Sequence, residues 1–411
     1  MNIKGQYLFI AILGTLLSQS VSAQNYMTLP KGVRMFFARN VQSDVESSYN
    51  KSASETPYKY EINADIENLE TLDDERVQGV LEVFKDYPDA YNLISLGRYK
   101  LEASAQVEVN AYAFAYGINN RLTAYIGLPI YDAKVKLDYR TVKKSTGAEV
   151  SDALTKEYGD DYAQALGQVV DQIYSIDAGV IQSAFVNNLG YQELGDWQGS
   201  GLGDLEFGLF YNFLRESKYG AYTKLGGVAP TGYVDNPDII QDIGFGDGQW
   251  DTYLEVGAAY RVLPKLFLEA ETRYTYQFSS EKRLRVPLST DIPLSEETAT
   301  FEEKLGNRYD TYLRATINAT DWLSIEPAMI FTYTERAKYS SSNSEANRIL
   351  AMNTKSNSRS FRVDAKITTA NLYLMNKFPI PTQLTFSAQN MIEGKNVAKT
   401  DLIEFEFRMF F

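Results

Sequence analysis

The chain ends in DLIEFEFRMFF, residues 401–411, and this stretch decides the fold class. Apolar and charged side chains alternate along it, so that Phe405 and Phe407 point one way and Glu406 the other. At the end of a soluble domain, such a strand would present an edge that pairs with other chains. We therefore expect a closed sheet, in which the last strand has a neighbour on both sides.

Composition narrows the classes of function. The 411 residues are 44% hydrophobic and 13% aromatic, with 30 Tyr and 21 Phe, which favours strands. The chain has no Cys and no His, which excludes disulfides, thiolate metal sites and every hydrolytic triad that needs a histidine base. The formal net charge of −13 argues against a nucleic-acid partner. We expect no cofactor.

The N-terminus reads MNIKGQYLFIAILGTLLSQSVSAQN. Lys4 precedes an apolar core, and small residues end at Ala23, which predicts a secretory signal peptide over 1–23 with cleavage after Ala23. The alternative is a membrane anchor, which would need about 20 apolar residues. We therefore expect the mature chain to be 24–411.

Period-two alternation recurs along most of the chain beyond residue 98. It is interrupted by short turns, such as 117–120, and by long polar connections, such as 138–201. Short and long connections at opposite ends are typical of a transmembrane β-barrel. Counting outward from the interruptions predicts twelve strands, near 32–46, 99–116, 121–137, 202–214, 219–233, 249–262, 265–280, 307–319, 322–339, 357–374, 382–395 and 400–411.

These observations predict an all-β fold, a transmembrane antiparallel β-barrel of about 12 strands with a helical insertion in a long extracellular loop. An even strand number puts both termini on the periplasmic side. Phe405, Phe407 and Phe411 would then touch lipid. Tyr and Trp near strand ends, such as Trp322, would form girdles at the two membrane boundaries. The alternative is a periplasmic β-sandwich with 401–411 as an edge strand.

The charged residues that alternate with apolar ones are predicted to face the lumen, because charge is costly in lipid and is solvated in a wet interior. Both signs are mixed, so strong anion or cation selectivity is not expected. Twelve strands lie between a filled eight-stranded interior and an open sixteen-stranded pore, which favours a narrow or gated path. The predicted lumen-facing residues are Lys100, Glu102, Glu108, Arg121, Glu206, Lys224, Asp251, Glu255, Arg261, Glu269, Glu271, Arg273, Arg308, Asp310, Arg314, Arg362, Asp364, Lys366, Glu404, Glu406 and Arg408.

Two long loops depart from the strand pattern. Residues 148–190 carry apolar residues at helical spacing, and 61–90 are acidic and partly helical. The first segment is either a lid or plug at the barrel mouth or a loop that packs outside the pore. The second either binds divalent cations near lipopolysaccharide or is a solvated face. The gate candidates are Leu154, Tyr158, Tyr162, Leu166, Val170 and Ile173.

Two further patterns carry weaker signals for a bound ion. Residues 234–251 supply carboxylate oxygens of the kind that Ca²⁺ prefers, but their spacing matches no EF-hand. The glycine-rich GSGLGDLEFG, 199–208, is followed by a strand rather than a helix, which argues against a phosphate cradle. We expect no metal site; the residues that a calcium ion would use are Asp235, Asp238, Asp242 and Asp247.

Four segments, in order, resemble a family of outer-membrane β-barrel transporter-like proteins associated with phenol (meta-pathway) degradation operons. They are YGINNRLTAYIGLPIY (116–131), GLGDLEFGLFYNF (201–213), KLGGVAPTGYVDNPD (224–238) and FGDGQWDTYLEVGAAYRV (245–262). The PTG at 230–232 and the GLGD at 201–204 are the most specific parts. The resemblance implies uptake of hydrophobic or aromatic small molecules. Segments 61–90 and 148–190 go beyond the family pattern.

The leading hypothesis is an outer-membrane channel or transporter for passive uptake of small solutes in a Gram-negative bacterium. The alternative is a structural or surface-interaction barrel with a closed lumen and no transport. An enzyme that uses Asp, Glu or Ser without His is a third and more distant reading. Expected partners are outer-membrane lipid and lipopolysaccharide, a small-molecule solute, and the barrel assembly machinery, because a C-terminal Phe resembles the signal that such proteins present to it.

Overall fold

Strands make up the body of the molecule. The computed structural model describes residues 27–70, 75–160, 166, 169, 178–287 and 294–411. A closed barrel of 12 antiparallel strands is formed, which confirms the predicted fold class. In chain order the strands are β1 (Arg34–Val45), β5 (Ser95–Asn119), β6 (Leu122–Lys143), β7 (Trp197–Leu202) continued by β8 (Leu205–Arg215), β9 (Tyr219–Ala229), β10 (Asp251–Leu263), β11 (Leu266–Gln277), β14 (Arg308–Asn318), β15 (Leu323–Thr334), β17 (Ser356–Thr368), β18 (Thr382–Lys395) and β20 (Asp401–Phe410).

The last strand has a partner on each edge. β20 pairs with β18 on one side and with β1 on the other, and β1 pairs in turn with β5. The ladder extends to the final residue, because Arg34 and Phe411 exchange two backbone hydrogen bonds of 2.7 and 3.0 Å. Ile403 and Phe405 are exposed, whereas Glu404 and Glu406 are buried. The alternating C-terminal stretch is therefore a seam strand with an apolar outer face.

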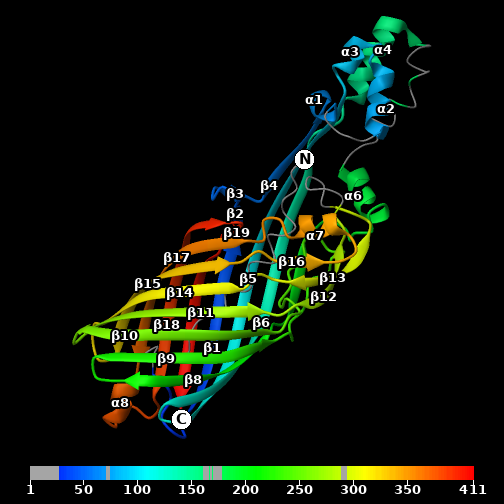
Figure 1. Cartoon of the computed structure of the whole chain (residues 1–411). Helices are drawn as coiled ribbons and strands as arrows, with labels where there is room; N and C mark the ends of the chain where they lie inside the picture. The colour runs from blue at the N-terminus through cyan, green and yellow to red at the C-terminus, as the bar shows by residue number, and fades with distance from the viewer. Residues whose placement is uncertain (1–26, 71–74, 161–165, 167–168, 170–177, 288–293) are drawn as a thin grey trace.

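The connections are short at one end of the barrel and long at the other. β5 and β6 are joined by 120–121, β8 and β9 by 216–218, and β10 and β11 by 264–265. A longer connection at the same end, between β17 and β18, contains α8 (Ala370–Leu374), which lies near the C-terminus in Figure 1. Short turns of this kind mark the periplasmic end of an outer-membrane barrel.

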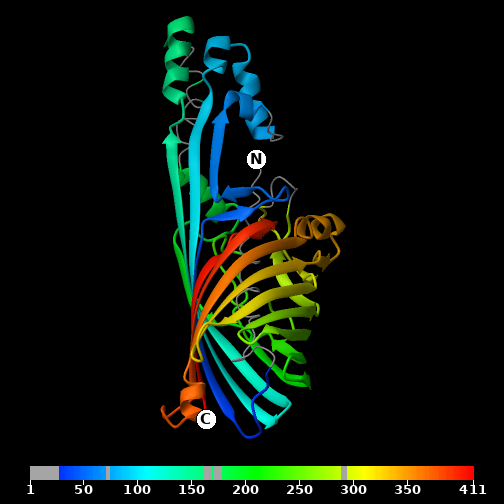
Figure 2. The same ribbon diagram turned by 90° about the vertical axis from the view of Figure 1, so that its left-hand side faces the viewer.

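Beyond the outer mouth, β5 and β6 continue as a long arm (Figures 1 and 2). Their pairing runs from Asn119 and Leu122 at the periplasmic turn to Arg98 and Lys143 near the tip. β4 (Lys59–Asp65) adds a third strand to the outer part of β5. The arm ends in a group of helices, α1 (Ile66–Leu69), α2 (Glu75–Phe84), α3 (Pro88–Tyr91) and α4 (Gly147–Tyr158), which we call the head.

The head has its own apolar core. Leu81 and Phe84 of α2 pack with Val150 and Leu154 of α4, and all four are at most 2% exposed. The described residues of the acidic segment 61–90 and of the start of 148–190 thus form one unit. Among the helices that the structure describes, none is long and apolar enough to cross a membrane.

Short elements surround the rest of the outer mouth. One small sheet contains β12 (Ser280–Arg285), β13 (Thr298–Lys304) and β16 (Lys338–Ser340), packed against α7 (Ser344–Leu350) through Phe301 and Leu350. A second contains β2 (Ser47–Tyr49), β3 (Glu55–Pro57) and β19 (Val397–Ala398). α6 (Ala178–Asn187) lies between the head and the mouth (Figure 1).

Aromatic residues gather on the outer surface near strand ends. Tyr274, Tyr309 and Tyr333 are directly paired across β11, β14 and β15, with ring centroids 5.0 and 5.9 Å apart. Trp250 and Trp322, at the two ends of strands, are 54% and 47% exposed. This distribution is the one that lipid–water boundaries favour.

We predict that the head unfolds, while the barrel stays folded, when a side chain in the core of the head is truncated. Leu154→Ala should cost the head about 2–5 kcal/mol, because Leu154 is 1% exposed in a small core. Limited proteolysis should then cut within 66–158 while the barrel keeps the heat-dependent electrophoretic mobility of folded barrels. Glu149→Ala, at an exposed position of α4, is the matched control. Parental protease resistance in Leu154→Ala would contradict the prediction.

Candidate functional site

Strand register identifies the lumen face of each strand, because directly paired residues share a face of the sheet. Arg39 of β1 pairs with Glu406 on one side and Ala111 on the other, and all three are buried. The next residue, Asn40, pairs with Phe405, which is exposed. Odd-numbered residues of β1 and β5 therefore face the lumen, and even-numbered ones face outward.

Ion pairs form a belt on the lumen wall, which begins on β8 to β11. Nζ of Lys224 lies 2.7 Å from a carboxylate oxygen of Glu255, which also accepts a 2.9 Å hydrogen bond from the Tyr222 hydroxyl. Arg273 lies 3.2 Å from Glu206. Glu255 and Arg273 are 3% and 8% exposed. Their charges are therefore stabilised mainly by their ion-pair partners, Lys224 and Glu206, and less by solvent.

The belt continues across β11, β14, β15 and β17. Arg314 lies 3.4 to 3.7 Å from three carboxylates, those of Glu269, Glu271 and Glu326. Glu326 is shared with Lys366, at 2.7 Å. One guanidinium therefore links three neighbouring strands, which is a geometry that its planar fork of donors allows.

The belt closes on the seam between β20 and β1. Arg362 lies 2.6 Å from Asp364 and 3.1 Å from Glu404. Arg39 lies 3.2 Å from Glu404 and 3.1 Å from Glu406. Glu404 thus joins β17 to β1 across the last strand, so the charged face of 401–411 cross-links the closure of the barrel.

Most residues predicted to face the lumen have that orientation. Their function in a pore stays a prediction. Arg121 instead lies in the β5–β6 turn. Arg261 pairs with buried Phe267 and so is on the lumen face of β10, where it is exposed at the periplasmic end with its guanidinium 5.0 Å from the centroid of the Phe267 ring. The other inward residues are Glu206, Lys224, Asp251, Glu255, Glu269, Glu271, Arg273, Arg308, Asp310, Arg314, Arg362, Asp364, Lys366, Glu404, Glu406 and Arg408.

The prediction for Lys100, Glu102 and Glu108 is wrong. Glu108 pairs with Gln42, which pairs on its other side with exposed Ile403, so this row faces outward. Lys100 and Glu102 are on the same face of β5, on the arm, where they form a 2.7 Å ion pair. The outer part of β5 has left the membrane, so its outward face is in water and carries charge.

The inner face of the same part of β5 and β6 is apolar. It packs on residues 230–250, which we call the inner loop, because this connection between β9 and β10 contributes Ile243 and Phe245 to the core. Phe245 stacks on Tyr131 with centroids 5.3 Å apart. The remaining buried members of this core are Val41, Val45, Tyr58, Ala105, Val107, Val109, Ala133, Val135, Ala398 and Leu402.

Asp204, between β7 and β8, anchors the inner loop by hydrogen bonding. Its carboxylate accepts a 2.8 Å hydrogen bond from the Gly232 amide. A Cβ at Gly246 would lie 2.4 Å from an Asp204 oxygen, so only glycine allows this approach. The PTG and GLGD sequences are therefore brought together by one carboxylate.

The aspartates of the inner loop have separate partners. Asp235 pairs with Lys282 at 2.7 Å, Asp238 with Arg285 at 2.6 Å, and Asp242 accepts from the Tyr233 hydroxyl at 2.7 Å. Asp247 accepts from the Gln249 amide at 2.8 Å. No group of three or more metal-ligating side chains occurs among the residues that the structure describes, so these four do not form the calcium site considered above.

The gate candidates are not in the lumen where the structure describes them. Leu154 belongs to the core of the head, Leu166 packs against that core, and the Tyr158 ring meets Tyr87 edge-on at 5.0 Å. The head lies at the tip of the arm, away from the barrel mouth (Figure 2). Tyr162, Val170 and Ile173 lie outside the described residues. A plug made by α4 is therefore excluded, and the apolar stripe is explained by helix packing.

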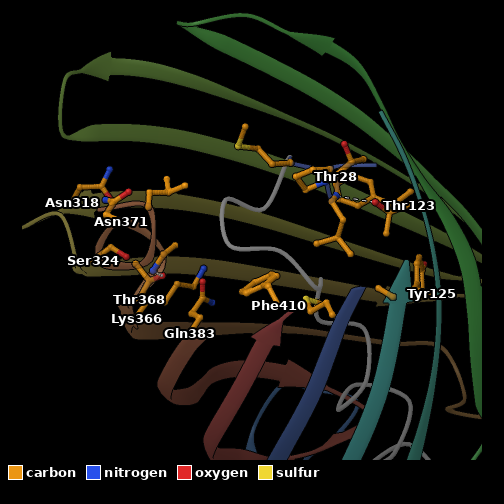
Figure 3. A pocket seen from close by; sticks show the side chains of 18 of the residues that line it. Thr28, Thr123, Tyr125, Asn318, Ser324, Lys366, Thr368, Asn371, Gln383 and Phe410 are labelled. Atoms are coloured by element: carbon orange, nitrogen blue, oxygen red, sulfur yellow. Dashed lines mark hydrogen bonds between the residues drawn. The ribbon is translucent and has the colours of Figure 1, made fainter. Parts of the chain in front are cut away.

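A cavity of about 730 Å³ occupies the periplasmic half of the lumen (Figure 3). One wall is mainly apolar and the other carries hydroxyl, amide and ammonium groups, so the cavity is amphipathic. The apolar wall contains Met35, Ala115, Tyr125, Phe210 and Phe410. The polar wall contains Ser324, Lys366, Thr368, Asn371 and Gln383, and Glu206, Lys224, Glu255 and Arg273 of the belt also line the cavity.

Three parts of this site were absent from the sequence prediction. Arg39 was missed because β1 alternates weakly, although its partner strand β20 alternates clearly. Glu326 is on the same face of β15 as Ser324 and Ala328, and the alternation of this strand could have predicted its lumen orientation. The part played by Met27 to Pro30, which line the cavity, has no signal in the local sequence.

The closed barrel, its apolar outer band and its buried charges are those of an outer-membrane β-barrel, and the fold is one that channels use. No family model and no curated protein matches the chain. An outer membrane channel from Pseudomonas putida F1 matches with a TM-score of 0.53 and 13% identity, over 95% of this chain and 100% of that one. This likeness shows a shared fold.

Two further solved structures match less closely. The monoaromatic hydrocarbon channel CymD has a TM-score of 0.35 and 10% identity, over 93% of this chain and 88% of that one. The toluene transporter of Ralstonia pickettii has a TM-score of 0.35 and 8% identity, over 93% and 90%.

We predict that Arg362→Met destabilises the folded barrel by about 3 kcal/mol. This is the lower end of the cost of breaking a buried ion pair, because Glu404 keeps Arg39 as a partner. Urea unfolding from detergent micelles measures the change. The control, Arg359→Met, removes an outward arginine of the same strand whose pair with Glu393 is exposed, and it should change stability by less than about 1 kcal/mol.

We predict that the inner loop packs more stably at acid pH. Burial, with the charges of Asp204 and Glu303, raises the pKa of Asp247 from 3.8 to about 7. The folded state then binds a proton that the unfolded state releases, so stability falls as pH rises from about 4 to 7. The thermal midpoint should be higher at pH 5 than at pH 8. Asp247→Asn should shrink this difference, whereas Asp132→Asn on the arm should not.

Proposed function

We propose that this protein is an outer-membrane channel of a Gram-negative bacterium for passive uptake of small hydrophobic or aromatic solutes. The observation that carries the proposal is the amphipathic cavity in the lumen. Its volume of about 730 Å³ is in the range of small-molecule sites. A barrel with no use for its interior would be expected to fill it with side chains.

The lining of the cavity favours a solute with an apolar body and one small polar group. The ring of such a solute would lie against Tyr125, Phe210 and Phe410, and its polar end would meet Thr368 or Gln383 (Figure 3). Two of the solved structures that match the fold are a monoaromatic hydrocarbon channel and a toluene transporter. Our working substrate class, a phenol-type solute, rests on the lining of the cavity.

Ionic solutes would find little selectivity in the belt. Its arginines and lysines are paired with carboxylates within 4 Å, so the wall carries alternating rather than net charge. Flux would follow the concentration gradient of the solute. We also propose that the outer face contacts lipopolysaccharide and that the barrel assembly machinery recognises β20.

The second candidate is a surface-interaction barrel without transport. The arm and head favour it, because a folded helical unit carried beyond the mouth is more than a simple channel needs. The inner loop favours it too, since Ile243 and Phe245 fill one side of the outer lumen. These features are compatible with a channel only if a path remains along the charged wall.

Proteoliposomes test the two proposals. We predict that vesicles with the purified barrel swell faster than protein-free vesicles in benzoate, and faster in benzoate than in a disaccharide, because the cavity is narrow and partly aromatic. Phe410→Ala should reduce the preference for benzoate. Phe386→Ala, on the lipid-facing side of β18, should leave it unchanged. Swelling equal to that of empty vesicles with both solutes would favour the surface-interaction barrel.

A further inference from the structure

The segment before β1, residues 27–33, leaves the barrel wall and enters the lumen. We call it the strap. The Thr28 hydroxyl donates to the carbonyl of Asn120, and the Leu29 amide donates to the Thr123 hydroxyl, both at 2.9 Å. The Lys31 amide donates to the side-chain oxygen of Asn120, also at 2.9 Å. The strap is thus tied to the periplasmic β5–β6 turn (Figure 3).

The strap packs on two neighbouring clusters of the lumen wall. Leu29 packs against the cluster of Met35, Phe37 and Ala115 on β1 and β5. Two residues earlier, Met27 packs against the cluster of Phe210, Tyr222 and Ala259 on β8, β9 and β10. The strap therefore passes over the lumen side of β6, which lies between the two clusters and contributes Tyr125 to both.

The β5 strand is shaped to accept the strap. A Cβ on Gly117 would lie 2.1 Å from the carbonyl oxygen of Pro30, which no side chain tolerates. Gly117 also exchanges backbone hydrogen bonds with Gly32 and Val33, at 2.8 and 2.9 Å. Thr28 is only 5% exposed although it lies at the cavity. The close approach of Gly117, the hydrogen bonds and the burial of Thr28 all indicate a single, well-defined position for the strap.

We propose that the strap is the size filter of the channel at its periplasmic exit. Met27, Thr28, Leu29 and Pro30 all line the cavity, next to Tyr125 and Phe210 on its apolar wall. They occupy volume through which a solute would otherwise pass. The strap is held in place by hydrogen bonds between neutral groups and by apolar contacts. In this position it sets the width of the exit. This inference rests on the proposed channel function.

The test compares the full-length barrel with a variant that lacks residues 27–30, in planar bilayers and in swelling assays with sugars of increasing mass. Removal of the strap should raise single-channel conductance several-fold and admit sugars that the parent excludes. Thr123→Val combined with Asn120→Ala, which removes two side-chain acceptors of the strap, should give an intermediate increase. Lys377→Ala, at an exposed position of the periplasmic connection between β17 and β18 and outside the lining of the cavity, is the matched control and should leave conductance unchanged.

The outcomes separate this proposal from the channel proposal. Conductance in the deletion variant but not in the parent would support the strap as a filter. Equal conductance and equal size limits in both would overturn the filter and leave the channel standing. No conductance in either would overturn both. If the deletion variant does not show the mobility of a folded barrel, the Thr123→Val, Asn120→Ala variant decides by the same criteria.

Discussion

Every peptide group in the hydrocarbon of a bilayer needs a hydrogen-bond partner within the protein, and this constraint explains the closure of the sheet. The first and last strands therefore pair along their length, and the pairing extends to Phe411. Closure of the barrel then determines which side chains the outer and inner faces of each strand can carry. The outer face of β20 is apolar because it meets lipid, and its inner face is charged because Glu404 and Glu406 find arginines on neighbouring strands.

The relation between face and polarity reverses where the strands leave the membrane. Tyr112 and Phe114 face lipid on the lower part of β5, whereas Gln106 and Glu108 occupy the same face above them. On the inner side, Val107 and Val109 pack on the inner loop instead of facing a wet lumen. A single long strand thus serves as barrel wall, wall of an apolar core and stalk of the head.

The parts of the structure that depend on local sequence were predictable. The predicted strands agree with the observed ones, because alternation and turn residues report the environment of each position directly. The orientation of Lys100 and Glu102 was not predictable, since period two shows that two faces differ without showing which is wet. Leu154 packs with Phe84, and Met27 packs with Phe210, although the two residues of each pair are distant in the chain. The local sequence around Leu154 or Met27 does not indicate which segment it contacts.

The seam between β1 and β20 also bears on how the molecule is made. Its two strands are separated by nearly the whole chain, so the entropic cost of bringing them together is met only at the end of folding. Until the final residues arrive, β1 keeps an unsatisfied edge that would pair with any other strand nearby. The barrel cannot close before its carboxyl-terminal strand is made, so closure is a late step of folding.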